Sequence, residues 1–238
     1  MGVFVLIHGA GSGAWVWHRV APRLERKGHT VITPDLPGHG LHPIPMAEVT
    51  LAAYVDSVNR ILEAQSEPVV LVGHSMGGAV ITQAAEHFPA KIKTLVYLAG
   101  YLLRNGESML EIAQADTESL LLANAIFSAD QRSATFRPEA VREIGYGDCS
   151  DEDMALVRSL LAPQAIAPLA TPLTTSADNF GRVPRVYIEC LRDKTIGPAT
   201  QKRMYTALPC SQVITMDTSH NPYLSDPEAL ANHLLSLL

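Results

Sequence analysis

Cysteine is scarce in this chain, which has three cysteines in 238 residues. Cys149, Cys190 and Cys210 cannot all pair with one another, and none belongs to a C-x-x-C motif. A disulfide framework needs an even set of cysteines and a zinc knuckle needs closely spaced ones, so neither is predicted. We interpret the three residues as unpaired thiols that are either small buried side chains or surface groups.

The chain also lacks an excess of basic residues. Lys and Arg number 18 against 24 Asp and Glu, which gives a formal net charge of −6. A protein with this balance has no electrostatic attraction for nucleic acid or for an anionic membrane. The first apolar run, residues 3–7, follows no basic segment and is too short to span a bilayer. We therefore expect a cytoplasmic protein with no nucleic-acid partner and no membrane partner.

Aromatic residues are also few, at 6% of the chain, so the composition does not indicate a dedicated stacking site. Hydrophobic residues make up 47% and charged residues 18%, which is typical of a globular protein with a sizeable core. The length allows one large domain, or one domain that carries an insertion.

Short apolar runs rich in β-branched residues recur along the chain, with amphipathic stretches between several of them. This alternation predicts an α/β fold with a mostly parallel sheet of about six strands and flanking helices. The expected strands cover residues 3–7, 30–33, 69–72, 94–99, 185–190 and 212–216. The expected flanking helices include residues 15–27, 50–65 and 227–238.

The most informative motif is Gly73-His74-Ser75-Met76-Gly77, a G-x-S-x-G sequence directly after the third expected strand. A helical pattern of small and apolar residues follows at 78–87. A serine in such a sharp strand-to-helix turn sits on strained backbone, and its hydroxyl is pushed out of the sheet. Ser75 is therefore the candidate nucleophile.

The alternation of strands and helices stops between residues 102 and 182, where no convincing strand can be recognised. Helical patterns cover residues 108–125 and 150–161 instead. We interpret this stretch as an inserted helical cap over the end of the sheet that carries Ser75. A long excursion packed on the sheet edge is the alternative. The predicted division is an α/β core and a helical cap, namely residues 1–101 with 183–238, and residues 102–182.

A serine hydroxyl is a weak nucleophile at neutral pH and needs a base that is itself oriented by an acid. In strand–turn–helix serine hydrolases, these partners follow the serine in the order acid, then histidine. Asp193 follows the fifth expected strand and His220 follows the sixth, so both lie at the sheet edge where Ser75 lies. We predict that Ser75 is the nucleophile, His220 the base and Asp193 the acid.

Three other acidic residues are rivals for the role of Asp193. Glu189 falls within its strand and should point into a face of the sheet. Asp217 and Asp226 flank His220 in its own loop. Asp193 is preferred because of its order in the chain and its place at a strand end.

The oxyanion of a tetrahedral intermediate needs two backbone donors. We expect one from the N–H of Met76 and the other from the glycine-rich loop at residues 8–13, where Ala10 is the expected donor. This loop lacks the G-K-[ST] ending of a phosphate-binding loop, and no acidic residue follows at the dinucleotide spacing. His39 and His42 have no carboxylate or cysteine beside them that completes a metal-ligand set. We therefore expect no cofactor and no metal.

Taken together, these residues and motifs make the chain resemble members of the α/β-hydrolase superfamily. The matching segments are residues 8–10 after the first expected strand, residues 35–40 after the second, the Ser75 turn, and the loops of Asp193 and His220. Within the superfamily it is most similar to the branch of plant methyl esterases, hydroxynitrile lyases and related bacterial esterases. The sequence Gly13-Ala14-Trp15-Val16-Trp17 is particularly like that branch.

This resemblance implies ester hydrolysis rather than cleavage of a cyanohydrin. The lyases of the branch carry a threonine after the first-loop histidine and a lysine after the catalytic histidine, where this chain has Gly9 and Asn221. We expect a serine carboxylesterase that works through an acyl-enzyme intermediate. The alternatives are hydroxynitrile lyase-type C–C cleavage, a thioesterase or amidase, and a ligand sensor on a hydrolase scaffold.

The expected partner is a small-molecule ester, apolar or aromatic, bound by a monomer or homodimer. Gly9, His74 and Asn221 are expected near the catalytic groups, and apolar cap residues are expected to line the rest of the pocket. Ordinary helix packing is the alternative for the cap residues, which are Leu102, Leu103, Met109, Leu121, Leu122, Ile126 and Phe127.

Overall fold

The computed structural model describes residues 1–238 and has a six-stranded sheet at its centre. The strands lie in the order β2-β1-β3-β4-β8-β9, and every neighbouring pair is parallel. Their bounds are β1 (Val3–Ile7), β2 (Thr30–Ile32), β3 (Val69–His74), β4 (Ile92–Leu98), β8 (Arg185–Cys190) and β9 (Gln212–Met216). The predicted mostly parallel sheet of about six strands is confirmed, and all six expected segments form strands.

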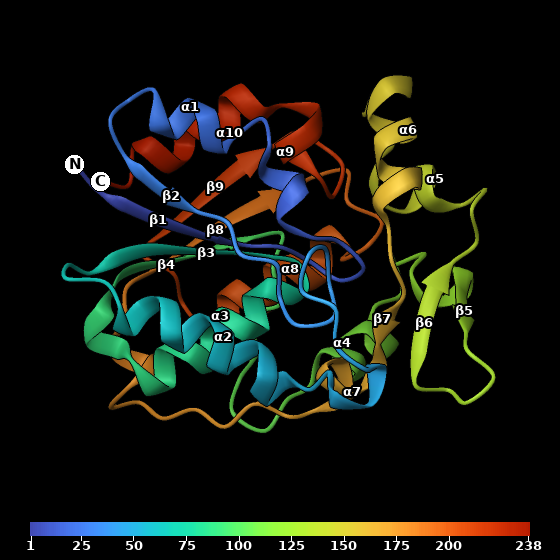
Figure 1. The fold of residues 1–238 in the computed structure, drawn as a ribbon, viewed down its shortest axis with the longest axis horizontal. Helices are drawn as coiled ribbons and strands as arrows, with labels where there is room; N and C mark the ends of the chain where they lie inside the picture. The colour runs from blue at the N-terminus through green and yellow to red at the C-terminus, as the bar shows by residue number, and fades with distance from the viewer.

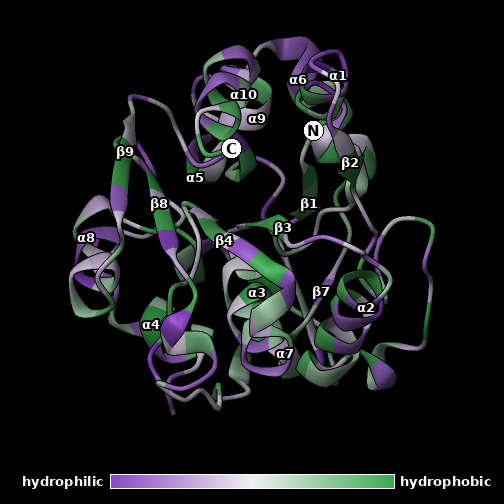
Figure 2. Cartoon of the chain, turned by 90° about the vertical axis from the view of Figure 1, so that its left-hand side faces the viewer, coloured by the Kyte–Doolittle hydropathy of each residue, from purple (hydrophilic) through white to green (hydrophobic).

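Helices cover both faces of this sheet, because alternate residues of each central strand point to opposite faces. Val5 and Ile7 pack in one hydrophobic cluster with α2 and α3, whereas Phe4 and Leu6 pack in the other with α1 and α10. Figure 2 shows α1 and α10 on one side of the sheet and α2 and α3 on the other. The bounds are α1 (Ala21–Glu25), α2 (Leu51–Glu63), α3 (Met76–His87), α8 (Pro198–Ala207), α9 (Pro222–Ser225) and α10 (Pro227–Leu235).

Local sequence accounts for where two of these helices begin. The Thr50 hydroxyl accepts a hydrogen bond from the N–H of Ala53 at 3.1 Å and so caps α2. The single helix expected at residues 15–27 is wrong in extent, since this region forms a 3₁₀ turn at Ala14–Trp17 and then α1. Pro22 lies in the first turn of α1, where its missing N–H costs no helical hydrogen bond, and this sets the later start.

Residues 102–182 contain helices, but they also contain three short strands, so the expectation of no strand here is wrong. The strands form an antiparallel sheet in the order β5-β6-β7. Runs of two to four residues are too short to show an alternating pattern in sequence. The elements are α4 (Met109–Ala115), β5 (Ala125–Phe127), β6 (Ser133–Phe136), α5 (Val141–Gly145), α6 (Asp151–Leu160), β7 (Gln164–Ala165) and α7 (Ile166–Ala170).

The helix expected at residues 108–125 is also shorter than predicted, because α4 ends at Ala115. The next residue, Asp116, accepts hydrogen bonds from the N–H groups of Glu118 at 3.0 Å and Gly197 at 2.8 Å. A side chain that bonds the backbone two residues ahead favours a turn over a continued helix. The chain therefore leaves the helix and runs along the loop that follows β8.

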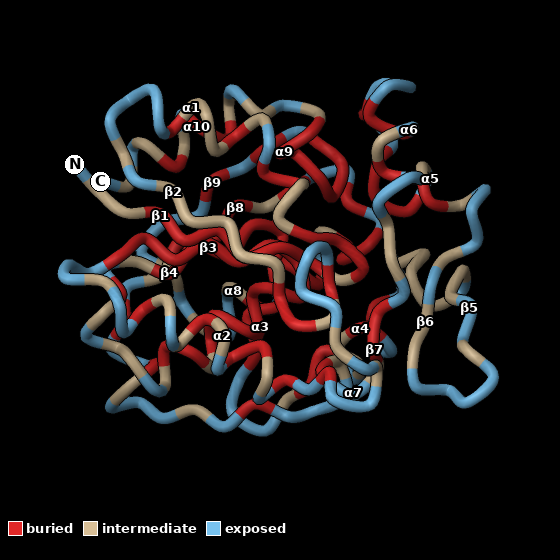
Figure 3. The backbone as a smooth tube through the Cα atoms, in the orientation of Figure 1, coloured by how far each residue is buried: buried red, intermediate tan, exposed pale blue.

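The elements from α4 to α7 lie at the carboxyl ends of the parallel strands, toward which β8 and β9 point in Figure 1, while the chain termini lie at the opposite end. Residues 171–182 then run back along α3 to the start of β8. Figure 3 shows the central strands as buried and the hairpin of β5 and β6 as largely exposed or intermediate. No helix of the structure combines the length and the apolar character needed to cross a membrane. The division into a core and a cap remains a prediction, and we use the word cap for residues 102–182.

Candidate active site

Ser75 lies in the turn between β3 and α3, with φ 52° and ψ −120°. A residue with a Cβ rarely adopts positive φ, so the backbone here is strained, as expected for a serine lifted out of the sheet. Glycines on both sides allow the turn. A Cβ on Gly73 would collide with the Gly77 carbonyl oxygen, and a Cβ on Gly77 would lie 2.8 Å from the Ile7 carbonyl oxygen.

Asp193 and His220 meet at the ends of β8 and β9, where His220 Nδ1 lies 2.6 Å from Asp193 Oδ2. The same carboxylate accepts hydrogen bonds from the N–H groups of Thr195 (2.6 Å) and Ile196 (2.9 Å), and from Gln201 Nε2 (3.0 Å). Both partners are buried, at 3% and 4% exposure. These donors satisfy a carboxylate that has little access to water and hold it in one orientation.

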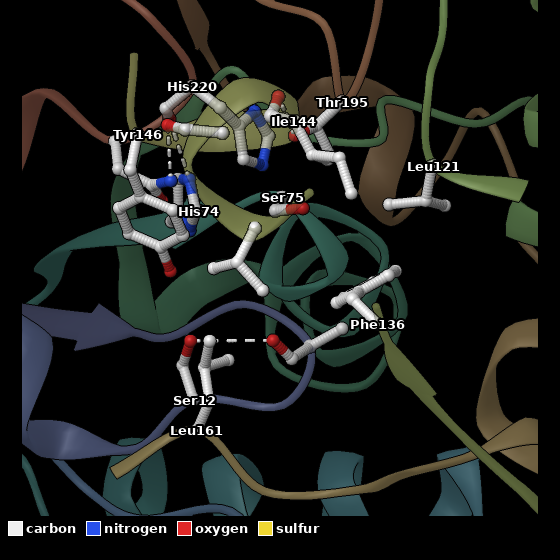
Figure 4. Close-up of a pocket in the computed structure, with 14 residues that line it drawn as sticks. Ser12, His74, Ser75, Leu121, Phe136, Ile144, Tyr146, Leu161, Thr195 and His220 are labelled. Atoms are coloured by element: carbon white, nitrogen blue, oxygen red, sulfur yellow. Dashed lines mark hydrogen bonds between the residues drawn. The ribbon is translucent and has the colours of Figure 1, made fainter. Parts of the chain in front are cut away.

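The ring of His220 has one nitrogen free for chemistry. Because a carboxylate only accepts hydrogen bonds, Nδ1 carries the proton and Nε2 is left as an acceptor. Nε2 is buried and has no hydrogen-bond partner in the protein, and Figure 4 shows the ring directed toward Ser75. In this arrangement Nε2 can take a proton from a serine hydroxyl.

The two backbone groups expected to hold an oxyanion lie beside Ser75. The N–H groups of Ala10 and Met76 make no hydrogen bond within the protein. Met76 is the first residue of α3, where the helix leaves its N–H groups unpaired and the helix dipole is positive. Both groups are therefore available to an anionic oxygen.

His8 orients the peptide group that carries the Ala10 donor. Its Nε2 accepts a hydrogen bond from the N–H of Leu36 at 3.0 Å, so Nδ1 holds the proton and donates to the Gly9 carbonyl at 2.8 Å. Burial lowers the pKa of His8 to about 4, so the ring is neutral at pH 7 as this pattern requires. Since a trans peptide directs its N–H away from its carbonyl, holding Gly9 also sets the direction of the Ala10 N–H.

His74, which we expected near the pocket, contacts His220, the candidate base, directly. Its Nε2 donates to the His220 carbonyl at 3.0 Å, and the two ring centroids are 4.6 Å apart. Burial lowers the pKa of His74 well below its ordinary value, and the neighbouring His220 acts in the same direction. His74 is therefore a neutral ring that supports the backbone of His220.

The three other acidic residues considered for the role of Asp193 bond to groups other than the His220 ring. Glu189 is bonded to hydroxyl groups on α8 and β9, at 3.0 Å and 2.8 Å. Asp217 is exposed and pairs with Arg192 at 3.1 Å, while Asp226 caps α10. Of these four acidic residues, only Asp193 is bonded to the His220 ring.

Ser75 lies where two cavities meet, since it lines both of them. The first cavity lies beside Ser75 and His220 and holds about 470 Å³ of empty space, part of it open to solvent. Figure 4 shows its labelled residues around Ser75 and His220. Its polar side chains are Ser12, His74, Ser75, Tyr146, Thr195, His220 and Asn221.

The second cavity lies under the cap and is apolar. It holds about 680 Å³ of empty space, and 14 of its 17 lining residues are hydrophobic. Neither cavity has Lys, Arg, Asp or Glu among its lining residues, so neither offers a partner to a charged ligand. The lining of the second includes Met76, Tyr101, Met109, Phe127, Phe136 and Leu169.

Some of the predicted pocket residues line a cavity and others do not. Leu121 lines both cavities, and Met109, Leu122 and Phe127 line the second. Leu102 and Leu103 lie in the hydrophobic core instead, at 1% and 0% exposure, because they pack with the α3 side of the sheet. Two further members of the predicted set, Ile126 and Gly9, line neither cavity.

Asn221 lines the first cavity, but its amide group is used within the protein. Its Nδ2 donates to the Gly145 carbonyl at 2.7 Å, and its Oδ1 accepts from the Tyr223 hydroxyl. Asn221 therefore shapes the wall of the cavity and leaves little polar capacity for a ligand.

Sequence reasoning missed two buried glutamines that support the site. Gln201 on α8 donates to Asp193, as described above. Gln164 on β7 accepts from the N–H of Gly11 at 3.1 Å and donates to the Tyr54 hydroxyl at 3.1 Å, which ties the cap to the loop after β1. A lone glutamine belongs to no catalytic motif; the one available signal, a polar residue on the buried face of a helix, applies to Gln201 alone.

Comparison with known proteins gives a consistent set of similarities. The model of the Alpha/beta hydrolase family matches residues 4–233. Putative methylesterase 11, chloroplastic, of Arabidopsis thaliana is 33% identical over 98% of the chain, which spans only 63% of that relative's length. Salicylic acid-binding protein 2 of Nicotiana tabacum is 32% identical over 98% of this chain and 96% of its own. The crystal structure of polyneuridine aldehyde esterase has a TM-score of 0.89 and 27% identity, covering 100% of this chain and 99% of that one.

Proposed function

Because the chain belongs to the alpha/beta hydrolase family, we propose that it is a serine carboxylesterase that needs no cofactor. The observation that carries the proposal is the His220 ring, which is bonded to Asp193 through Nδ1 and directs an unpartnered Nε2 toward Ser75. The similarity to proteins named as methylesterase and esterase supports the same class of reaction.

The proposed reaction has two halves. Ser75 Oγ attacks the ester carbonyl carbon while its proton passes to His220 Nε2, and the N–H groups of Ala10 and Met76 stabilise the oxyanion. The C–O bond to the alcohol then breaks, and His220 returns the proton to the departing oxygen. Water next attacks the acyl-enzyme with His220 as the base, which releases the acid and restores Ser75. Asp193 stays ionised and stabilises the imidazolium that forms in each half.

The two cavities suit the two arms of such an ester. The leaving oxygen takes its proton from His220, so the alcohol must occupy the first cavity, where His220 lies. The acyl chain then extends past Met76 into the apolar second cavity, which gains free energy by removing apolar surface from water. We therefore propose that the substrate is a neutral ester with an apolar or aromatic acyl group.

Hydrolysis is better supported than C–C cleavage. The hydroxynitrile lyases need a hydroxyl and an ammonium group at the positions of Gly9 and Asn221. A Cβ on Gly9 would lie 2.8 Å from His74 Nδ1, so a larger residue does not fit there without movement. The Asn221 amide is occupied by Gly145 and Tyr223.

The nucleophile is tested by Ser75→Ala. We expect hydrolysis of a chromogenic ester to fall by at least about 10⁴-fold, because loss of a triad serine leaves only the oxyanion donors and binding. Ser236→Ala, at an exposed position, is the matched control and should keep full activity. Full activity in the Ser75 variant, or ligand binding without turnover in the wild type, would contradict the proposal.

The substrate class is tested with esters that vary one arm at a time. Methyl esters of increasingly long apolar acids should gain in kcat/KM, whereas acetates of increasingly bulky alcohols should not. Matched thioesters and amides in the same panel would reveal a preference for another bond. The reverse dependence on arm length would overturn the assignment of the two cavities.

A further inference from the structure

One segment of the cap is bonded to the loops that carry both His220 and Asp193. We call residues 141–149, which comprise α5 and the residues after it, the α5 turn. The Gly145 carbonyl accepts from the Ser219 hydroxyl at 3.1 Å and from Asn221 Nδ2 at 2.7 Å. The residues directly before and after His220 are therefore both held by one carbonyl group of the cap.

Asp148 adds a second contact to the same loop. Its Oδ2 accepts the N–H of Ser219 at 2.8 Å, and its Oδ1 shares the one hydroxyl proton of Ser219 with the Gly145 carbonyl. The side chain is only 13% exposed, and Arg192 Nη2 lies 3.4 Å from it and balances its charge. A partly buried carboxylate that accepts from both a backbone N–H and a hydroxyl is a strong and directional anchor.

The loop of Asp193 is bonded to the same segment. The Thr195 hydroxyl donates to the Ile144 carbonyl at 3.0 Å, and Thr195 itself donates its N–H to Asp193. A neighbouring ion pair, Lys194 with Glu143 at 3.0 Å, joins the same two segments but is half to two-thirds exposed. Such an exposed pair contributes little, whereas the buried bonds have no water to replace them.

His220 needs this support because nothing on its catalytic side holds it. Its Nε2 has no partner, so the ring is placed by Asp193 at one nitrogen and by the backbone from which it extends. A displacement of about 1 Å between reacting groups can cost on the order of a hundredfold in rate. Small movements of the residue before His220 therefore change the alignment of Nε2 with Ser75.

We infer that Asp148 is a positioning residue for His220, which it aligns through Ser219. Through Asp148 and the Gly145 carbonyl, the cap then supports the position of His220 as well as lining the first cavity. The effect on catalysis rests on the proposed esterase function, while the alignment of the ring does not.

The test compares Asp148→Asn with Glu143→Gln. Asp148→Asn keeps the shape but removes the negative charge. Its carbonyl oxygen can still accept the Ser219 N–H and its NH₂ group can donate to the Ser219 hydroxyl oxygen, so charge-assisted bonds are replaced by weaker neutral ones. The kcat per active site, counted with a fluorophosphonate, should fall about tenfold with KM changed less than about twofold. Glu143→Gln removes only the exposed ion pair between α5 and Lys194, and the variant should behave as wild type.

A second readout is independent of any substrate. The low-field proton NMR signal of His220 Nδ1–H reports the bond to Asp193, and it should broaden or shift in Asp148→Asn but not in Glu143→Gln. In a Ser219→Ala background, Asp148→Asn should lower kcat less than it does in the wild type, since part of the link is already absent.

The outcomes separate the two proposals. An unchanged NMR signal, or a lower melting temperature with unchanged kcat per active site, would overturn the positioning role and leave the esterase in place. A wild type that hydrolyses no ester, but whose NMR signal responds to Asp148→Asn, would overturn the esterase and leave the positioning role in place.

Discussion

The loops around Ser75 and the hairpin of β5 and β6 both border the candidate site, yet they are held in different ways. The loops are buried and bonded to one another through His8, His74, Asp193 and the α5 turn. The hairpin is bonded mainly along its own strands and to β7. Its Ile126 and Phe127 side chains are 45% and 51% exposed.

This difference separates two tasks. The proposed catalytic groups must stay aligned to within less than an ångström, and buried hydrogen bonds hold them there. Few substitutions are tolerated in such a network. The hairpin offers apolar surface to the second cavity, and its Phe136 also lines the first, but it makes no hydrogen bond to Ser75, Asp193 or His220 and so can vary without disturbing their alignment. Changes in the loops should therefore alter kcat or stability, whereas changes in the hairpin should alter KM.

The largest expected effect is a loss of folding stability at acid pH. The folded pKa of His8 is about 4 against 6.5 for a free histidine, so the unfolded chain binds a proton that the folded protein does not between these values. The stabilisation that depends on neutral His8 is therefore present above pH 6.5, and about 3 kcal/mol of it is lost as the pH drops to 4. His74, whose pKa is also lowered by burial, adds to the loss.

Urea unfolding from pH 7.5 to 4 measures this loss. His8→Asn removes the titrating group, so the free energy of unfolding of the variant should depend less steeply on pH than that of the wild type. The hairpin, residues 125–136, contains no histidine and so has no group of this kind that titrates between pH 6.5 and 4. If the free energy of unfolding changes equally with pH in the wild type and in His8→Asn, His8 is not the source of the loss.

The next effect concerns the α5 turn. A Cβ on Gly145 would lie 2.8 Å from Asn221 Nδ2 and 3.2 Å from Thr195 Oγ1, so Gly145→Ala must move the Asn221 side chain and crowds that of Thr195, both of which are bonded to this turn. We expect kcat to fall about tenfold with little change in KM. Gly147→Ala is the matched control, because a Cβ there meets nothing within 4 Å. Equal kcat in the two variants would mean that the turn and the triad are not coupled.

The smallest effect concerns the hairpin. Phe127→Ala removes part of the edge of the second cavity, and a half-exposed phenylalanine contributes on the order of 1 kcal/mol. KM for long-acyl esters should therefore rise about fivefold, with kcat and the KM for acetates unchanged. Ile126→Ala, the adjacent residue that lines neither cavity, should match the wild type. A drop in kcat for Phe127→Ala would remove the distinction between hairpin and loops.

Sequence reasoning performed best where the chemistry is local or follows from strand order. The Ser75 turn was recognisable because strand, glycines and helix lie within one short stretch. Asp193 and His220 were predictable because the carboxyl ends of parallel strands meet at one sheet edge. The hairpin was missed because its strands are too short to show a period, and its pairing depends on contacts outside each strand.

The supporting residues were not predictable for a different reason. Asp148 and Ser219 are 71 residues apart, and neither belongs to a motif. Gln201 resembles any helical glutamine until its contact with Asp193 is seen. Leu102 and Phe127 are both apolar residues of the cap region, yet one packs in the core and the other lines the cavity.

The sequence by itself determined the parallel sheet, the strained turn of Ser75 and the order of the acid and the histidine. These features depend on periodicity, glycine positions and strand ends, all of which are written in neighbouring residues. Only the tertiary structure decided which carbonyl and carboxylate groups hold His220 and which apolar side chains face the second cavity. These features depend on how segments that are distant in the chain pack together, and the local sequence pattern does not predict that packing.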